Sequence, residues 1–189
     1  IFLNCEISEN RVINGGGGVY YLNNIGENDL LVDSCLFFSN FAIDGGGFYS
    51  EKLDASSDQI IFRSTVFSKN LASISNGEGG AIAIIDLTFS KTGETHLYNC
   101  LFMNNEASGG GCLSNFESNT LLINCIILDS KSGSGGVIRR GQNSFVNCTI
   151  YGFSSNGGSF SQSGTHHLYN CILIEDRPDS IPSAPIASG

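Results

Sequence analysis

Residues 97–105, Leu-Tyr-Asn-Cys-Leu-Phe-Met-Asn-Asn, decide the fold, because their pattern returns along nearly the whole chain. The two-residue step at 99–100 recurs six more times, at intervals of 23 to 35 residues. Its first residues are Asn4, Ser34, Ser64, Asn99, Asn124, Asn147 and Asn170, and its second residues are Cys5, Cys35, Thr65, Cys100, Cys125, Cys148 and Cys171. A fixed order of residue types at such intervals predicts a solenoid of stacked repeats.

Large apolar residues flank this step in every unit, three residues before its second residue and two residues after it. They are Phe2, Val32, Phe62, Leu97, Leu122, Phe145 and Leu168 before, and Ile7, Phe37, Phe67, Phe102, Ile127, Ile150 and Leu173 after. Strict alternation along one strand would place positions five apart on opposite faces. We therefore expect a bend at the small polar residue before the Cys position, where Asn tolerates a left-handed backbone.

A glycine pair follows in six units and leads into further, mostly apolar residues. The pairs are Gly17-Gly18, Gly46-Gly47, Gly79-Gly80, Gly110-Gly111, Gly135-Gly136 and Gly157-Gly158. Glycine permits a second corner with positive φ or close backbone approach, and a third strand would follow. Three short strands and three corners per unit predict an all-β fold, a right-handed parallel β-helix of about six or seven coils without substantial helix.

Two other fold classes fit the sequence less well. No segment of 11 residues free of Gly holds a helical apolar stripe, and the composition is rich in Gly, Ser and Asn. An antiparallel sandwich would explain short strands but not their fixed order of residue types. We expect the β-helix over residues 1–176, as a fragment of a longer chain. Residues 177–189 hold all three prolines and are expected to form a tail or linker.

Six of the seven cysteines share one repeat position, so we expect them to form an inward column of free thiols. Stacked Cβ atoms about 4.8 Å apart are too distant for a disulfide, which requires about 3.8 Å. Thr65 fills the same position with a similar volume, and Cys112 is expected in the core away from the column. The Asn residues before the cysteines are expected to stack into a second, hydrogen-bonded column. The predicted structural ladder comprises Asn4, Cys5, Cys35, Thr65, Asn99, Cys100, Asn124, Cys125, Asn147, Cys148, Asn170 and Cys171.

Few residues suggest a catalytic, metal-binding or cofactor-binding site. Zinc ligands with C-x-x-C spacing do not occur, and we expect no metal, no cofactor and no catalytic residue. His96 and His167 occupy equivalent positions, which favours a corner at the edge of a coil over catalysis. Residues 50–59 and 83–96 lengthen their units, and variable loops on a regular scaffold often carry function. Their charged residues are Glu51, Asp54, Asp58, Asp86, Lys91 and Glu94.

The charge balance narrows the range of partners. The formal net charge is −9, with only nine Lys and Arg residues along the chain. Nucleic acids and anionic membranes require clustered basic residues, so neither is an expected partner. No apolar run approaches the 18 or so residues of a membrane-spanning helix.

The sequence resembles a known family of repeats. Residues 67–70 (Phe-Ser-Lys-Asn) and 79–82 (Gly-Gly-Ala-Ile) are similar to the F-x-x-N and G-G-A-[ILV] motifs of the polymorphic outer membrane protein family of chlamydiae. Residues 37–40 and 102–105 also match the first motif, whereas only 79–82 match the second as written. The resemblance implies a β-helix at the cell surface or outside the cell, with an adhesive or antigenic role. It also implies a host-cell protein or a surface glycan as partner.

A carbohydrate-active enzyme is the alternative function, because pectin lyases and galacturonan hydrolases share the β-helical architecture. Such enzymes need acids clustered on adjacent coils for Ca²⁺ or for proton transfer. The sequence lacks Asp-Asp, Gly-His-Gly and Arg-x-Lys signatures, and a solvated strand edge explains the pair Arg139-Arg140. A non-enzymatic adhesin-like or structural segment is therefore expected, with a polysaccharide-binding or pectin-lyase-like protein as the alternative.

Overall fold

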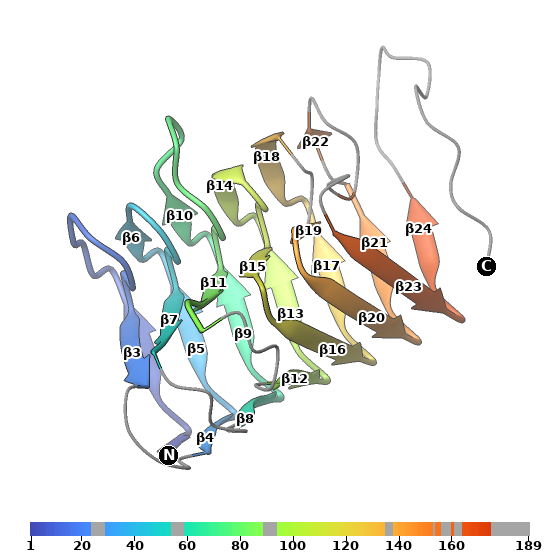
Figure 1. Cartoon of the computed structure of the whole chain (residues 1–189), viewed down its shortest axis with the longest axis horizontal. Helices are drawn as coiled ribbons and strands as arrows, with labels where there is room; N and C mark the ends of the chain where they lie inside the picture. Colours follow the sequence, from blue (N-terminus) through green and yellow to red (C-terminus); the bar gives the residue numbers. More distant parts are fainter. Residues whose placement is uncertain are drawn as a thin grey trace.

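The structure is a computed structural model that describes residues 1–23, 29–53, 59–88, 94–134, 138–152, 154–155, 160 and 164–174. These residues form 24 short strands and no helix. The strands assemble into four sheets in which all pairings are parallel. Figure 1 shows successive strands stacked side by side along the long axis of the molecule, with β3 near one end and β24 at the other. This all-β arrangement is consistent with a β-solenoid.

Two sheets have seven strands each and lie on either side of the residue that precedes the Cys position. Sheet I comprises β1 (Phe2–Leu3), β4 (Leu30–Asp33), β8 (Gln59–Arg63), β12 (Glu94–Tyr98), β16 (Asn119–Ile123), β20 (Gln142–Val146) and β23 (Thr165–Tyr169). Sheet II comprises β2 (Glu6–Ser8), β5 (Leu36–Phe38), β9 (Val66–Ser68), β13 (Leu101–Met103), β17 (Ile126–Leu128), β21 (Thr149–Tyr151) and β24 (Ile172–Ile174).

The other two sheets have five strands each and complete the circuit of each unit. Sheet III comprises β6 (Phe41–Ala42), β10 (Leu71–Ala72), β14 (Glu106–Gly109), β18 (Lys131–Ser134) and β22 (Ser154–Ser155). Sheet IV comprises β3 (Val19–Asn23), β7 (Phe48–Lys52), β11 (Ile82–Asp86), β15 (Leu113–Phe116) and β19 (Ile138–Arg139). A complete unit therefore passes through sheets I, II, III and IV in turn.

The predicted bend between sheets I and II is confirmed. All seven residues before the Cys position have positive φ, between 46° and 55°. They are Asn4, Ser34, Ser64, Asn99, Asn124, Asn147 and Asn170. The flanking apolar residues stack in register as predicted; for example, Phe62 pairs with both Val32 and Leu97, and Phe67 with both Phe37 and Phe102. The bend lets both flanking positions point into one core.

We expect the corner position to tolerate glycine but not a β-branched residue. Asn124→Gly should leave the free energy of unfolding within about 0.5 kcal/mol of the natural chain, because glycine enters the left-handed region without strain. Asn124→Val should lower it by roughly 1–2 kcal/mol, the cost of that region for an ordinary residue. Urea unfolding followed by circular dichroism measures both. Equal losses in the two variants would show that the side chain, and not the backbone conformation, matters at this corner.

The expectation of three strands per unit was wrong, because a second left-handed corner separates sheet II from sheet III. Positive φ occurs one residue after sheet II in six units, at Glu9, Ser39, Lys69, Asn104, Asp129 and Gly152. In three units the position falls inside the F-x-x-N motif, directly before Asn40, Asn70 and Asn105. Charged and polar residues fill most of these left-handed positions, so their composition alone did not mark a turn.

The buried asparagine column lies at this second corner and not at the predicted one. Asn4, Asn99, Asn124, Asn147 and Asn170 are exposed, because the left-handed bend turns their side chains outward. One side-chain bond joins two of them, from Asn170 Nδ2 to Asn147 Oδ1 at 2.7 Å. The asparagines that directly follow the second corner form the continuous ladder instead, with side-chain amide bonds of 3.0 to 3.1 Å linking Asn10, Asn40, Asn70 and Asn105.

The Cys column makes a hydrogen bond that the sequence did not suggest. Each of its seven residues donates its thiol or hydroxyl to the carbonyl two residues earlier; Cys35 Sγ lies 3.2 Å from Asp33 O, and Thr65 Oγ1 lies 2.8 Å from Arg63 O. The position therefore requires a small donor, not volume alone. All seven cysteines are free; Cys5 and Cys171 are half-buried, and the other five are buried. Burial raises the pKa of the Cys112 thiol well above its ordinary value.

The glycine corner is shifted by one residue from its predicted alignment in two units. Gly16, Gly45, Gly79 and Gly110 are the equivalent residues with positive φ. Consequently Phe48 pairs with Ile82, and Ile82 with Leu113, so that Ala81 and Cys112 occupy the corner itself. This correction decides which side chains of sheet IV face the interior, because a one-residue slip reverses the faces of a strand.

Candidate functional site

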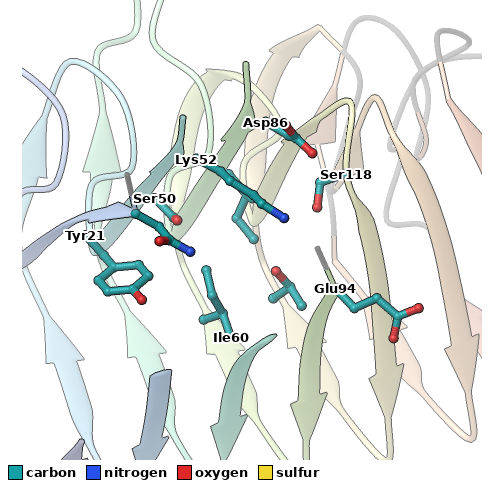
Figure 2. Close-up of a pocket in the computed structure, with 10 residues that line it drawn as sticks. Tyr21, Ser50, Lys52, Ile60, Asp86, Glu94 and Ser118 are labelled. Carbon is teal, nitrogen blue, oxygen red and sulfur yellow. The ribbon is translucent and has the colours of Figure 1, made fainter. Parts of the chain in front are cut away.

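A small pocket lies where the ends of β3, β7 and β11 meet the starts of β8 and β12 (Figure 2). Its lining residues are Tyr21, Asn23, Ser50, Lys52, Ile60, Ile84, Asp86, Glu94, Thr95 and Ser118. Six of them belong to 50–59 and 83–96, the two insertions that the sequence singled out. Both insertions are partly regular strand, since they contain the end of β7, most of β11 and the start of β12. Asp54, Asp58 and Lys91 lie outside the described residues.

Strand alternation explains why charged side chains enter this pocket. Inward and outward residues alternate along β7, so Lys52 shares the interior face with Ser50, while Glu51 lies on the outer face. Asn23, Lys52 and Asp86 are register partners on three adjacent strands. All three are at least nine-tenths buried. The end of sheet IV thus carries a polar inward row, and the row before it already includes the buried polar residues Ser50 and Asn115.

Lys52 and Asp86 place opposite charges in the same buried space. Asp86 Oδ1 accepts a hydrogen bond from the Thr88 N–H at 2.9 Å. Its Oδ2 atom is buried and has no hydrogen-bond partner within the described part of the chain. Figure 2 shows the Lys52 side chain extending toward the side of the pocket that holds Asp86 and Ser118. An isolated buried carboxylate is costly, and the Lys52 ammonium group lies on the neighbouring strand and lines the same pocket.

The size of the pocket limits its chemistry. Its interior volume is about 20 Å³, which is enough for roughly one water molecule. A sugar ring or a comparable substrate does not fit in that volume. The pocket as described therefore lies at the corner between sheets IV and I.

A second group of polar residues lies on the outer face of sheet IV, and we call it the outer ridge. It consists of Tyr20, Tyr49, Glu51, Glu78, Ser114, Arg139 and Arg140. The rings of Tyr20 and Tyr49 stack with centroids 5.3 Å apart, and Tyr20 Oη donates to Glu51 Oε2 at 2.7 Å. Tyr20 is 48% exposed, so its ring remains available to a ligand.

Glu78 is the centre of the charged half of the ridge. Arg139 Nη1 donates to Glu78 Oε1 at 2.8 Å, and Arg140 Nη1 donates to Glu78 Oε2 at 3.1 Å. Ser114 Oγ donates to Glu78 Oε2 at 2.6 Å. The interpretation of Arg139-Arg140 as a solvated strand edge is therefore incomplete, because one carboxylate pairs with both guanidinium groups.

The outer ridge was not predicted from sequence, although a signal for it exists. Tyr20 and Tyr49 follow the glycine step at equivalent positions in successive units. Glu78 gave no such signal, because its partners lie 36 to 62 residues away in the chain. The hydrogen bond to Glu51 raises the pKa of Tyr20, and burial raises that of Tyr49. Both phenols stay protonated at neutral pH, so Tyr20 acts there as a hydrogen-bond donor.

The histidines lie within strands and not at a corner. His96 in β12 and His167 in β23 occupy equivalent positions of sheet I, as the sequence indicates. His96 Nε2 lies 2.8 Å from Glu94 Oε2, and its Nδ1 lies 3.2 Å from Tyr98 Oη. These three residues alternate along one strand on its outer side, which makes a surface hydrogen-bonded string.

Comparison with family models, curated proteins and solved structures finds no match to this chain. The residues that the structure describes contain no group of three or more His, Cys, Asp or Glu that could hold a metal ion. They also contain no helix long and apolar enough to cross a membrane. The fold and its outer surface define only the structural class of this chain. It is an all-β protein with parallel sheets, consistent with a solenoid.

Proposed function

We propose that this chain is a segment of right-handed parallel β-helix, with six or seven coils, that displays a binding surface on a cell-surface or extracellular protein. The four parallel sheets support the stacking, and parallel crossovers are right-handed in about 98% of cases. Location and family follow from the resemblance of residues 67–70 and 79–82 to the polymorphic outer membrane protein repeats. The chain acts without catalysis or cofactor in this proposal.

The observation that carries the proposal is the contrast between a small pocket and an extended, decorated exterior. The corner pocket has room for roughly one water, whereas the outer ridge presents an exposed aromatic ring and several hydrogen-bonding groups. Aromatic and Arg side chains are enriched where proteins recognise partners. A regular solenoid holds these groups at fixed separations, which suits contact with a host-cell protein or a surface glycan.

Binding of the purified 189-residue chain to epithelial cells tests the adhesive role. We expect saturable binding that falls at least about fivefold in Tyr20→Ala, because an aromatic anchor contributes 1 kcal/mol or more at an interface. Tyr169→Ala is the matched control, since Tyr169 is exposed on sheet I at the opposite end of the strand stack. Absence of binding, together with unchanged adhesion of a parent protein lacking this segment, would reject the adhesive role and leave a structural spacer.

Polysaccharide binding is the second candidate, and the exposed Tyr20 ring beside Glu51 favours it. A sugar ring stacks on an aromatic face while its hydroxyls bond to a neighbouring carboxylate. A glycan array probed with the natural chain and with Tyr20→Ala separates this candidate from protein binding. An ultraviolet lyase assay on polygalacturonate with Ca²⁺ tests the enzymatic version, and clear turnover would overturn the non-catalytic proposal.

A further inference from the structure

The outer face of sheet II is a mostly apolar stripe along the whole stack. Each of its seven strands points two residues outward, which gives fourteen outward positions. Ten of these are apolar or aromatic, and only Glu6, at one end, is charged. The apolar members are Leu36, Phe38, Val66, Leu101, Met103, Ile126, Leu128, Tyr151, Ile172 and Ile174. We call this face the sheet II stripe.

The stripe is most exposed at its β17–β24 end, and its other apolar residues are partly exposed. Ile126, Tyr151, Ile172 and Ile174 are 41% to 58% exposed. Within the described part of the chain, no other sheet is stacked on this face. Seven strands spaced about 4.8 Å apart make it roughly 30 Å long, and its three-residue strands make it about 10 Å wide. An apolar surface of roughly 300 Å² is comparable to the largest patch on many monomeric proteins, and such patches are often functional.

The charges on one rim of the stripe identify the occupant. The left-handed residues after sheet II form this rim, and Lys69 follows β9 while Asp129 follows β17. These strands are the two neighbours of β13 in sheet II. Reversing the order of the strands about β13 therefore places Lys69 where Asp129 was, and Asp129 where Lys69 was. Neither residue makes an ion pair within the described part of the chain, and Lys69 Nζ lies over the Phe38 ring at 5.4 Å.

We propose that the sheet II stripe is a homodimer interface, in which two copies pack face to face with their stacks running in opposite directions. The two-fold axis lies between the two β13 strands and parallel to them. This symmetry places Lys69 of each copy opposite Asp129 of the other, so the same pair forms twice. Leu101 then lies beside its own symmetry mate at the centre. A surface that is complementary to itself in both polarity and charge fits a second copy of this chain better than an unrelated partner.

The size and the ends of the stripe set the expected affinity. About 300 Å² of flat area per copy lies well below the roughly 800 Å² per partner of a standard interface, so the dimer should be weak and should form only at high protein concentration. Glu6 and Glu9 on and beside β2 come to lie at the outer ends of the dimer, where solvent screens them. The interface leaves the outer ridge of sheet IV free.

Sedimentation equilibrium of the full 189-residue chain over a range of concentrations tests the interface. We expect the average mass to rise from 20.1 kDa toward twice that value as the concentration increases. Leu101→Glu should keep the monomer mass throughout, because it places two carboxylates together at the axis. Leu121→Glu, an outward apolar position on sheet I, is the matched control and should dimerise like the natural chain.

Charge exchange on the rim gives the sharper test. Lys69→Asp and Asp129→Lys should each weaken dimerisation about tenfold or more, because like charges then meet twice. The double variant should recover the natural affinity to within about threefold. Matching thermal unfolding curves establish that each variant is folded. A natural chain that stays monomeric at all concentrations, or a double variant no better than the singles, would overturn the proposal.

Discussion

Replacing Asn70 with leucine should lower the free energy of unfolding by about 4 kcal/mol or more, among the largest effects available from one side chain. Asn70 Oδ1 accepts from the N–H and the side-chain amide of Asn40, at 3.1 and 3.0 Å. Its Nδ2 donates to Phe37 O at 2.9 Å and to Asn105 Oδ1 at 3.1 Å. Leucine has a similar size but bonds to none of them. Each orphaned buried group costs roughly 1–3 kcal/mol.

Asn10→Leu is the control for this change, because it alters the same ladder at its exposed end. Asn10 makes one side-chain bond to the ladder, from its Nδ2 to Asn40 Oδ1 at 3.0 Å. We expect the change to lower the free energy of unfolding by about 1 kcal/mol or less, since Asn40 Oδ1 still accepts a hydrogen bond from the Asn10 N–H at 3.1 Å. Urea unfolding monitored by circular dichroism gives both values; the chain has no Trp to report by fluorescence. Equal costs at the two positions would contradict a ladder that is buried in the middle and open at the end.

Phe67→Ala should destabilise the chain by about 3–5 kcal/mol, the usual cost of removing a buried phenyl ring. The Phe67 ring stacks between Phe37 and Phe102, with centroids 4.7 and 5.1 Å away. Removing it leaves a cavity in the middle of the column and breaks both stacked contacts. Because each unit of a solenoid contacts only its neighbours, the loss should also broaden the unfolding transition.

Phe38→Ala provides the matched comparison, one residue further along an equivalent strand and on the outer face. Phe38 is partly exposed on the sheet II stripe. Its replacement by alanine should lower the free energy of unfolding by about 1 kcal/mol at concentrations where the chain is monomeric. A larger loss for Phe38→Ala than for Phe67→Ala would mean that the inward and outward faces of sheet II are reversed.

The sequence predicted the elements that depend on stacking of like residues. Every flanking apolar position, from Phe2 to Leu173, found its equivalent in the next unit, because burial in a shared core requires the same type at each level. The corner before the Cys position was predictable for a similar reason, since few residues tolerate positive φ. These features repeat in fixed order and need no knowledge of distant contacts.

The predictions that were wrong concern the orientation of side chains and backbone within a short stretch of chain. The amide ladder was placed at Asn99 and its equivalents, although the left-handed bend turns those side chains to solvent. The second corner, one residue before Asn70, was hidden because Lys69 and Glu9 are unusual residues for positive φ. The pocket formed by Lys52 and Asp86 required the one-residue correction at the glycine corner. The predicted tail at 177–189 lies outside the described residues.

Nuclear Overhauser contacts between backbone protons of sheet II test the parallel stacking most directly. We predict cross-peaks that link Leu101 to both Val66 and Ile126, residues 35 and 25 positions away, in the pattern of parallel strands. The two Phe neighbours of Phe67 should give ring contacts to it in the same spectra. Cross-peaks that instead pair strands adjacent in sequence, such as 66–68 with 71–72, in an antiparallel pattern would contradict the fold proposed for this chain.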